Sequence, residues 1–216
     1  MHRCRCPASL LLAALALPLV ARAEEGAAVK LPPPQTEGGM PLMQALKERH
    51  STREFSPEKL QPQALSNLLW AAAGINRPGE GKRTAPSARN WQEIEVYVAM
   101  EDGLFLYDPK PHALVPRAKA DLRAATGMQD FVATAPVNLV YVADTSRPGA
   151  ISPEELTLYT AADTAFMAEN VYLFAASAGL GAVVRGAVDR EALKKAMGLR
   201  PAQRVVLCQS VGMPKK

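Results

Sequence analysis

Apolar residues recur at helical spacing in two segments of the first third of the chain. Pro41 suits a first helical turn, and the apolar stripe after it ends near Arg49, which predicts a helix over 41–49. Pro62 opens a second stripe that Gly74 stops. Each segment therefore predicts a short helix that buries one face.

The middle of the chain has the alternating pattern of strands. Residues 94–98 alternate between apolar and polar, Asp102-Gly103 is a turn signal and residues 104–107 return, so we expect a β-hairpin. We further expect a strand near 113–116, a helix near 118–125 and a strand over 137–143.

A long apolar segment follows Ser152-Pro153-Glu154-Glu155. This tetrapeptide has the form of a helix start, with a capping serine, a proline at the first position and acids in the first turn. The helix can run to Ala178 and is apolar on nearly all sides, so we expect it to be central or to lie at an interface. A short helix over 190–197 and a strand over 204–211 close the pattern.

The first 23 residues have the form of a secretory signal peptide. A basic start precedes an apolar run over 10–20, and Ala21-Arg22-Ala23 is a small-x-small cleavage pattern. The run is shorter than the roughly 20 residues that span a bilayer. We therefore expect a periplasmic or secreted protein without stable membrane insertion after cleavage. An uncleaved N-terminal anchor is the alternative.

Removal of this segment changes the composition that bears on function. Taking 23 of 216 residues leaves 193, enough for one domain over 40–216 behind a Pro/Gly-rich extended arm over 24–39. Three arginines and no acid are lost, so the net charge falls from +4 to +1 and gives no argument for nucleic acid binding. Cys208 alone remains, without a disulfide partner, and its apolar surroundings indicate a core residue. The arm could wrap a partner subunit or act as a tether.

Three segments carry candidate chemistry, and each has a plain structural alternative. Arg49-His50-Ser51-Thr52-Arg53 places two guanidiniums, an imidazole and hydroxyls where a helix ends, which suits a phosphate. Basic residues also complement a helix C-terminus. Residues 86–92, within a long polar loop over 76–92, combine small residues with amides that match a heterocycle edge, or form a turn and a cap. Residues 179–187 free backbone N–H groups for a ligand, or simply end a helix.

Taken together and in this order, the three segments resemble the nitroreductase superfamily of FMN-dependent oxidoreductases. The resemblance rests on Arg-His-Ser-x-Arg-x-Phe, Pro-Ser-x-x-Asn-x-Gln, the Gly-Leu-Gly turn and the Val-Gly-Met-Pro ending. It is strongest toward the branch that includes the peptide thiazoline and oxazoline dehydrogenases. The implied fold is α+β, with a central, mostly antiparallel sheet flanked by helices and an obligate-dimer architecture.

The resemblance also implies residue roles. Arg49 and Ser51 would grip the FMN phosphate with His50 near the ribityl chain, and Lys215 or Lys216 could complete that site. Arg53 would lie by the N1–C2=O edge, where positive charge favours the reduced ring. The backbone N–H groups of Gly186 and Ala187 would face N5 and O4, which makes these two residues and Arg53 the catalytic candidates. The other cofactor-binding candidates are Pro86, Ser87, Ala88, Asn90, Gln129 and Asp163.

The resemblance implies a homodimer with FMN at the interface, a small-molecule substrate, ping-pong electron transfer and no metal. Gly186 stands where many members carry an acid, which puts substrate preference in doubt. Export makes NAD(P)H an uncertain donor. Three functions stay open: a reductase of nitroaromatics, quinones or similar acceptors, a dehydrogenase that oxidises an unknown and possibly peptide-derived substrate, and a non-enzymatic flavin-binding module.

Overall fold

The computed structural model describes residues 26–215 of the 216-residue chain. The predicted signal peptide over 1–23 and its cleavage site lie outside the described residues. Within the described range, no helix has both the length and the apolar character needed to cross a bilayer.

A seven-stranded sheet forms the centre of the fold, in the order β1-β6-β5-β4-β7-β9-β8, and every neighbouring pair is antiparallel. Its strands are β1 (Val29–Lys30), β4 (Ile94–Met100), β5 (Gly103–Asp108), β6 (Ala113–Ala118), β7 (Val137–Asp144), β8 (Gly181–Arg185) and β9 (Gln203–Gly212). All eight residues of β7 are buried, as expected of a strand covered on both faces. The predicted α+β class and antiparallel sheet are confirmed.

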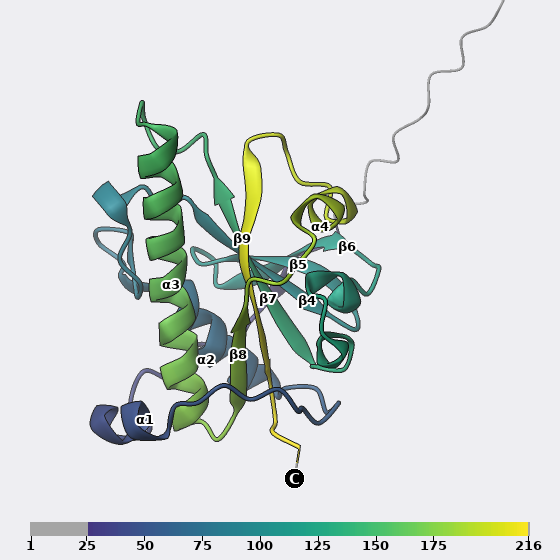
Figure 1. The fold of residues 1–216 in the computed structure, drawn as a ribbon. Coiled ribbons are helices and arrows are strands. Elements are labelled where there is room, and N and C mark those ends of the chain that lie inside the picture. Colours follow the sequence, from purple (N-terminus) through teal and green to yellow (C-terminus); the bar gives the residue numbers. More distant parts are fainter. Residues whose placement is uncertain (1–25, 216) are drawn as a thin grey trace, which may run out of the picture.

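Helices cover both faces of the sheet (Figure 1). The helices are α1 (Leu42–Glu48), α2 (Pro62–Ala73), α3 (Pro153–Ser177) and α4 (Arg190–Ala196). The first three pack together on one face, and α4 lies on the other with the 3₁₀ helices η2 (Arg123–Thr126) and η3 (Asp130–Ala133). Each face has its own apolar cluster. Cys208 belongs to the cluster on the α4 side, where burial raises the pKa of its thiol to about 11, so its prediction as a core residue is confirmed.

The long helix α3 begins as predicted. Ser152 Oγ accepts the Glu155 N–H at 3.1 Å, and a Glu155 carboxylate oxygen accepts the Ser152 N–H at 3.2 Å. This reciprocal pair fixes the first turn of α3. Large apolar side chains further along the helix remain exposed, including Leu158 at 63% and Phe166 at 47%.

The N-terminal arm packs on its own domain. Val29 pairs with Leu114 as strand β1, and Leu31 is buried in the core. The Ser66 hydroxyl on α2 donates to Pro32 O at 2.6 Å. The described part of the arm is thus an extra edge strand with its own core contact, rather than a free tether.

One local prediction was wrong, one was incomplete, and one strand was not predicted. No α-helix forms over 118–125, where only the last residues join the 3₁₀ helix η2. Strand β6 continues to Ala118, and the Asp121 carboxylate then accepts the Arg123 N–H at 3.0 Å, which competes with α-helical bonding. The polar loop over 76–92 is partly regular, with a ribbon of β2 (Ile75–Arg77) and β3 (Lys82–Arg83). The segment after α3 forms strand β8, which pairing with β9 stabilises.

Candidate functional site

Residues 49–53, which follow the end of α1, pack against helix α3. The Arg49 guanidinium lies 5.2 Å from the centre of the Tyr172 ring. Ser51 Oγ is 3.0 Å from the Tyr172 hydroxyl, which also accepts the Val184 N–H of β8 at 2.8 Å. His50 is exposed, and its Nδ1 lies 2.8 Å from the carbonyl oxygen of the last residue of α1. One tyrosine hydroxyl therefore holds the predicted phosphate segment against both a helix and a strand.

Three cationic side chains, Arg49, Arg53 and Lys215, belong to this segment or to the chain end beside it. Within the described residues, no carboxylate lies within 4.0 Å of Arg49, Arg53 or Lys215. The chain end runs beside the segment, because the Lys215 N–H donates to Glu54 O at 3.0 Å. Arg53 and Lys215 are exposed and Arg49 is half-buried. These cations are free to bind an anion.

Strand β8 packs tightly against residues 49–53. The Thr52 N–H donates to Ala182 O at 2.9 Å. A Cβ at Gly181 would come within 2.6 Å of the Thr52 Cγ2 atom, far closer than two carbon atoms tolerate. Gly181 is therefore required for the close approach of the two segments, which explains part of the predicted glycine motif.

The backbone just after β8 presents two unused donors. Gly186 and Ala187 are exposed, and neither donates its N–H to an acceptor within residues 26–215. A Cβ at Gly186 would meet nothing closer than Leu207 Cδ2 at 3.9 Å, so the space beside it is open. The Met128 N–H donates to Ala187 O at 3.1 Å, which brings the next residue, Gln129, to this place. The Gln129 Oε1 atom is buried and has no partner in the described structure.

Arg185, the last residue of β8, is a buried anchor that the sequence did not single out. Its guanidinium donates to Thr126 O at 2.6 Å and to Asn138 Oδ1 at 2.9 Å. Ser210 also donates to Asn138 Oδ1, at 2.5 Å. Burial lowers the pKa of Arg185. This network fixes the end of β8 and with it the two free amides.

The segment 86–92 lies beside the first half of α3. The Ala88 N–H donates to a carboxylate oxygen of Asp163 at 2.8 Å, and the Gln92 N–H donates to Ser87 Oγ at 3.0 Å. Pro86 is exposed, while Ser87 and Ala88 are half-buried. Asp163 thus holds the loop rather than pointing away from the protein.

The backbone of this loop is strained. Three residues other than glycine have positive φ angles, Arg89 at 49°, Asn90 at 56° and Gln92 at 50°. Each such residue costs free energy, and clusters of them are typical of functional sites. The Gln92 Nε2 group donates to Asn90 Oδ1 at 3.0 Å and to Gly81 O at 3.1 Å, which holds the loop in this shape.

A second buried acid lies next to Asp163. Glu93 is fully buried, and neither of its carboxyl oxygens accepts a hydrogen bond from a donor in the described structure. Burial and the neighbouring Asp163 charge raise the pKa of Glu93 to about 7, and burial also raises the pKa of Asp163. A single proton shared by the pair removes the repulsion between two buried carboxylates.

The structure brings together only part of the predicted site. The cations of 49–53 and Lys215 lie by the start of strand β8, where Thr52 donates to Ala182, and Gln129 and the free amides lie at the end of the same strand. The loop 86–92 is held by Asp163, nine residues before Tyr172 on the same helix, which is about 13.5 Å along the axis. Tyr172, Arg185 and Glu93 were not predicted as site residues, because their partners are far away in the sequence.

Comparisons with known proteins agree with this architecture. Residues 46–213 match the model of the Nitroreductase family. A curated protein of Methanocaldococcus jannaschii with a provisional nitroreductase name is 33% identical over 156 residues, which cover 68% of this chain and 78% of the relative. A crystal structure from Ralstonia eutropha JMP134, also provisionally named a nitroreductase, is 47% identical, covers 88% of this chain and 90% of its own, and has a TM-score of 0.84.

More distant structures share the fold alone. The Escherichia coli microcin synthetase complex with truncated pro-MccB17 has a TM-score of 0.70 at 19% identity, and covers 96% of this chain and 85% of its own. The NADPH:FMN oxidoreductase of Vibrio harveyi in complex with NAD⁺ has a TM-score of 0.60 at 23% identity, with coverage of 81% and 69%. On the family match and the two closer relatives, the chain belongs to the nitroreductase family and is an oxidoreductase of the nitroreductase type.

Proposed function

We propose that this protein is an FMN-dependent oxidoreductase that transfers electrons by a ping-pong reaction to nitroaromatic, quinone or similar small-molecule acceptors. The proposal rests on the family and on the backbone N–H groups and cationic side chains that have no partner in the described structure. FMN, when bound, supplies a ring that takes up hydride from one substrate and gives it to another.

The observation that carries the proposal is the pair of unused amides after β8. Exposed N–H groups of Gly186 and Ala187 stand at a strand end that Arg185 fixes in place, with open space beside Gly186. Such preorganised donors suit the polar edge of a flavin ring, where the atom that takes up hydride must be oriented. Gln129, with its unpartnered Oε1 atom, adds a polar group beside them.

The phosphate end would be held by the cations at the end of α1. Arg49, with the Ser51 hydroxyl, would bind the phosphate, His50 would lie near the ribityl chain, and Lys215 would add charge. Arg53 would supply positive charge by the ring edge. The arrangement fits an anionic cofactor because these cations lack acidic partners in the described structure and Tyr172 already holds their segment.

The remaining group, Ser87, Ala88 and Asn90, would contact the pyrimidine edge from a second subunit. We propose a homodimer for two reasons. First, the loop 86–92 is held by Asp163, which lies more than two turns of α3 away from Tyr172 and the phosphate segment. Second, α1 and α3 expose large apolar side chains that a partner subunit would cover. These side chains are Leu42, Met43, Leu46, Leu158 and Phe166, which are 62%, 76%, 47%, 63% and 47% exposed.

We propose export through the signal peptide over 1–23, which leaves a periplasmic or secreted enzyme. Reduced nicotinamide cofactors are cytoplasmic, so the physiological donor is a separate question. The branch resemblance supports a second candidate, a dehydrogenase that oxidises an organic substrate and passes the electrons to oxygen or a quinone. The two candidates differ in which partner reduces the flavin.

Anaerobic stopped-flow absorption of the FMN-loaded protein distinguishes them. Mixing with NADH or NADPH bleaches the flavin absorption if the protein is a nicotinamide-dependent reductase, and a nitroaromatic or quinone then restores it. Absence of bleaching with both donors contradicts the nicotinamide version. Bleaching by an organic substrate alone supports the dehydrogenase, and no bleaching by any reductant at a useful rate indicates a binding module.

A further inference from the structure

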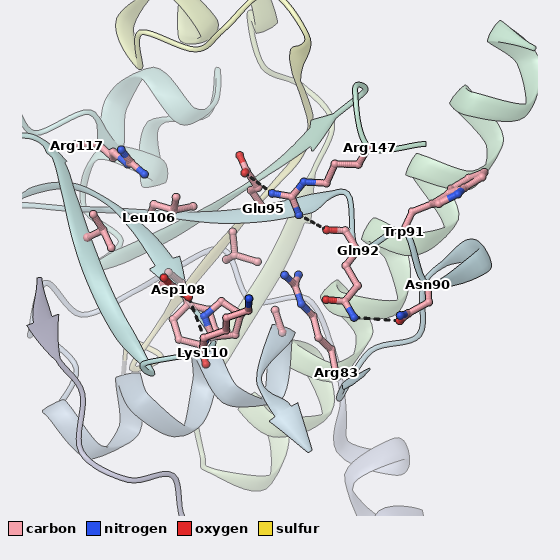
Figure 2. A pocket seen from close by; sticks show the side chains of 15 residues that line it. Arg83, Asn90, Trp91, Gln92, Glu95, Leu106, Asp108, Lys110, Arg117 and Arg147 are labelled. Atoms are coloured by element: carbon pink, nitrogen blue, oxygen red, sulfur yellow. Dashed lines mark hydrogen bonds and ion pairs between the residues drawn. The ribbon is translucent and has the colours of Figure 1, made fainter. Parts of the chain in front are cut away.

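A cavity of about 610 Å³ lies between the strained loop and the ends of β5 and β6 (Figure 2). It does not include the residues of 49–53 or the amides after β8. Four cationic side chains surround it from different elements, as Figure 2 shows, namely Arg83, Lys110, Arg117 and Arg147.

The acids in this cavity do not balance those cations. Arg147 donates to one Glu95 carboxylate oxygen at 2.7 Å, and Gln203 donates to the other at 2.6 Å, so Glu95 is fully engaged. Asp108 accepts the Lys110 backbone N–H at 3.0 Å. Within residues 26–215, no carboxylate lies within 4.0 Å of the charged groups of Lys110, Arg83 or Arg117. The cavity therefore holds an excess of positive charge.

Arg83 has unused hydrogen-bonding capacity at this place. Its Nη1 group donates to Ile94 O at 3.1 Å, but its buried Nε–H has no acceptor in the described structure. Burial, followed by the charge of Arg147, lowers the pKa of Arg83. A buried guanidinium donor without an acceptor costs free energy, which an anion would recover through a charge-assisted hydrogen bond.

The uncharged part of the lining combines the amides of Asn90 and Gln92 with apolar side chains from the sheet. The Trp91 ring turns toward α3 (Figure 2), where it packs edge-on against Tyr159. Val96, Leu106 and Val115 come from three adjacent strands. An inorganic ion alone would leave these side chains uncovered. The lining favours a ligand with an apolar body that carries its charges at the periphery.

We propose that this cavity binds a small organic molecule with two or more negative charges, carboxylate or phosphoryl, through Arg83, Arg117 and Lys110. The site uses none of the cations of the proposed flavin site, and Asn90 of the loop borders both. It is connected to the strained loop, because Arg147 donates to the Gln92 carbonyl oxygen at 2.6 Å. A bound anion would therefore stabilise the loop that the flavin proposal also uses.

Isothermal titration calorimetry of the purified protein at low ionic strength tests the site, with phenyl phosphate and phthalate as the phosphoryl and carboxylate probes. We expect saturable binding of one or both, one molecule per chain. Arg117→Gln should weaken it by at least roughly tenfold, as should Arg83→Gln. Arg117 is exposed and its side chain forms no hydrogen bond or ion pair in the described structure, so its variant tests the site even if Arg83→Gln unfolds.

Two control variants distinguish binding in this cavity from a general charge effect and from binding at the end of α1. Lys119→Gln removes an exposed charge just beyond β6, and Arg49→Gln removes a cation of the proposed flavin site. Lys119→Gln should bind the probes as the wild type does, and Arg49→Gln should keep the probe binding that Arg117→Gln loses. Failure of both probes to bind overturns the proposal, as does an equal loss in Lys119→Gln, which would indicate a general field effect. Loss in Arg49→Gln alone would place the anion at the end of α1 and also overturn it.

Discussion

Tyr172 connects three parts of the candidate site through one hydroxyl group. That group lies 3.0 Å from Ser51 Oγ, accepts the Val184 N–H at 2.8 Å, and belongs to the ring on which Arg49 rests. The sequence could not single it out, because a tyrosine in an apolar helix has the same local pattern as a core aromatic. Its hydrogen-bond partner is 121 residues away.

Tyr172→Phe should weaken both the fold and the phosphate segment. The Val184 N–H loses its acceptor in a partly buried place, so the free energy of unfolding should fall by about 1–2 kcal/mol, measured by urea denaturation. FMN affinity should fall with it, because Ser51 is no longer held. Tyr159→Phe on the same helix is the matched control, since the Tyr159 hydroxyl forms no hydrogen bond in the described structure. Equal effects of the two substitutions would contradict the role of Tyr172.

The shared proton of Glu93 and Asp163 makes stability depend on pH. The pKa of Glu93 is about 7 in the folded protein and about 4.5 in the unfolded chain. The folded state therefore keeps a proton that the unfolded chain releases, so the free energy of unfolding should fall as the pH rises from 4.5 to 7.

Glu93→Gln should remove most of this dependence, because an amide of the same shape does not titrate. Urea denaturation at several pH values measures it, and the variant should be more stable than the wild type at pH 8. Glu169→Gln, an exposed position on α3, should leave the pH profile unchanged. A wild-type slope in Glu93→Gln would show that Glu93 is not the titrating group.

Elements with local signals were predicted and those without them were missed. The start of α3 is specified by four consecutive residues that form a capping box, so its start and length followed from the sequence. Strand β8 has no such signal, because its five residues become a strand only through pairing with β9. The predicted helix over 118–125 failed for the opposite reason, since Asp121 offers the backbone a competing local hydrogen bond.

Gly181→Ala tests how closely β8 and the segment 49–53 must approach. The new methyl group would lie 2.6 Å from Thr52 Cγ2, so the two segments must separate. We expect destabilisation of about 1–3 kcal/mol and a lower FMN affinity. Gly149→Ala is the control, because nothing lies within 4 Å of the added Cβ. Thermal unfolding that is unchanged by Gly181→Ala would contradict this packing.

At the scale of the whole molecule, the family and the α+β sheet followed from three short motifs, but the arrangement of the site did not. The motifs predict which groups bind a cofactor. They do not predict that the loop 86–92 and the segment 49–53 contact different parts of α3, because spacing in the sequence does not give distance in the fold. A dimer reconciles the motifs with this separation, and the exposed apolar side chains of α1 and α3 are the surface it would use.

Phe166→Arg should break the proposed dimer. A charge placed in an apolar interface leaves a buried cation without a partner, so sedimentation equilibrium should shift from dimer to monomer, and FMN should be lost with it. Val29→Arg replaces a similarly exposed residue, 52% accessible, on β1 and should leave the dimer intact. A wild-type protein that sediments as a monomer with FMN bound would contradict the two-subunit site.

The central claim is that the free cations after α1 and the free amides after β8 hold FMN. The most direct measurement is the visible absorption spectrum of the purified protein, with the released flavin identified by mass spectrometry and counted per chain. We predict about one FMN per chain in the wild type, little in Arg49→Ala, and a wild-type amount in the control Lys195→Ala, an exposed α4 residue. A protein without flavin that also fails to bind added FMN, or an Arg49→Ala variant with full occupancy, would contradict the claim.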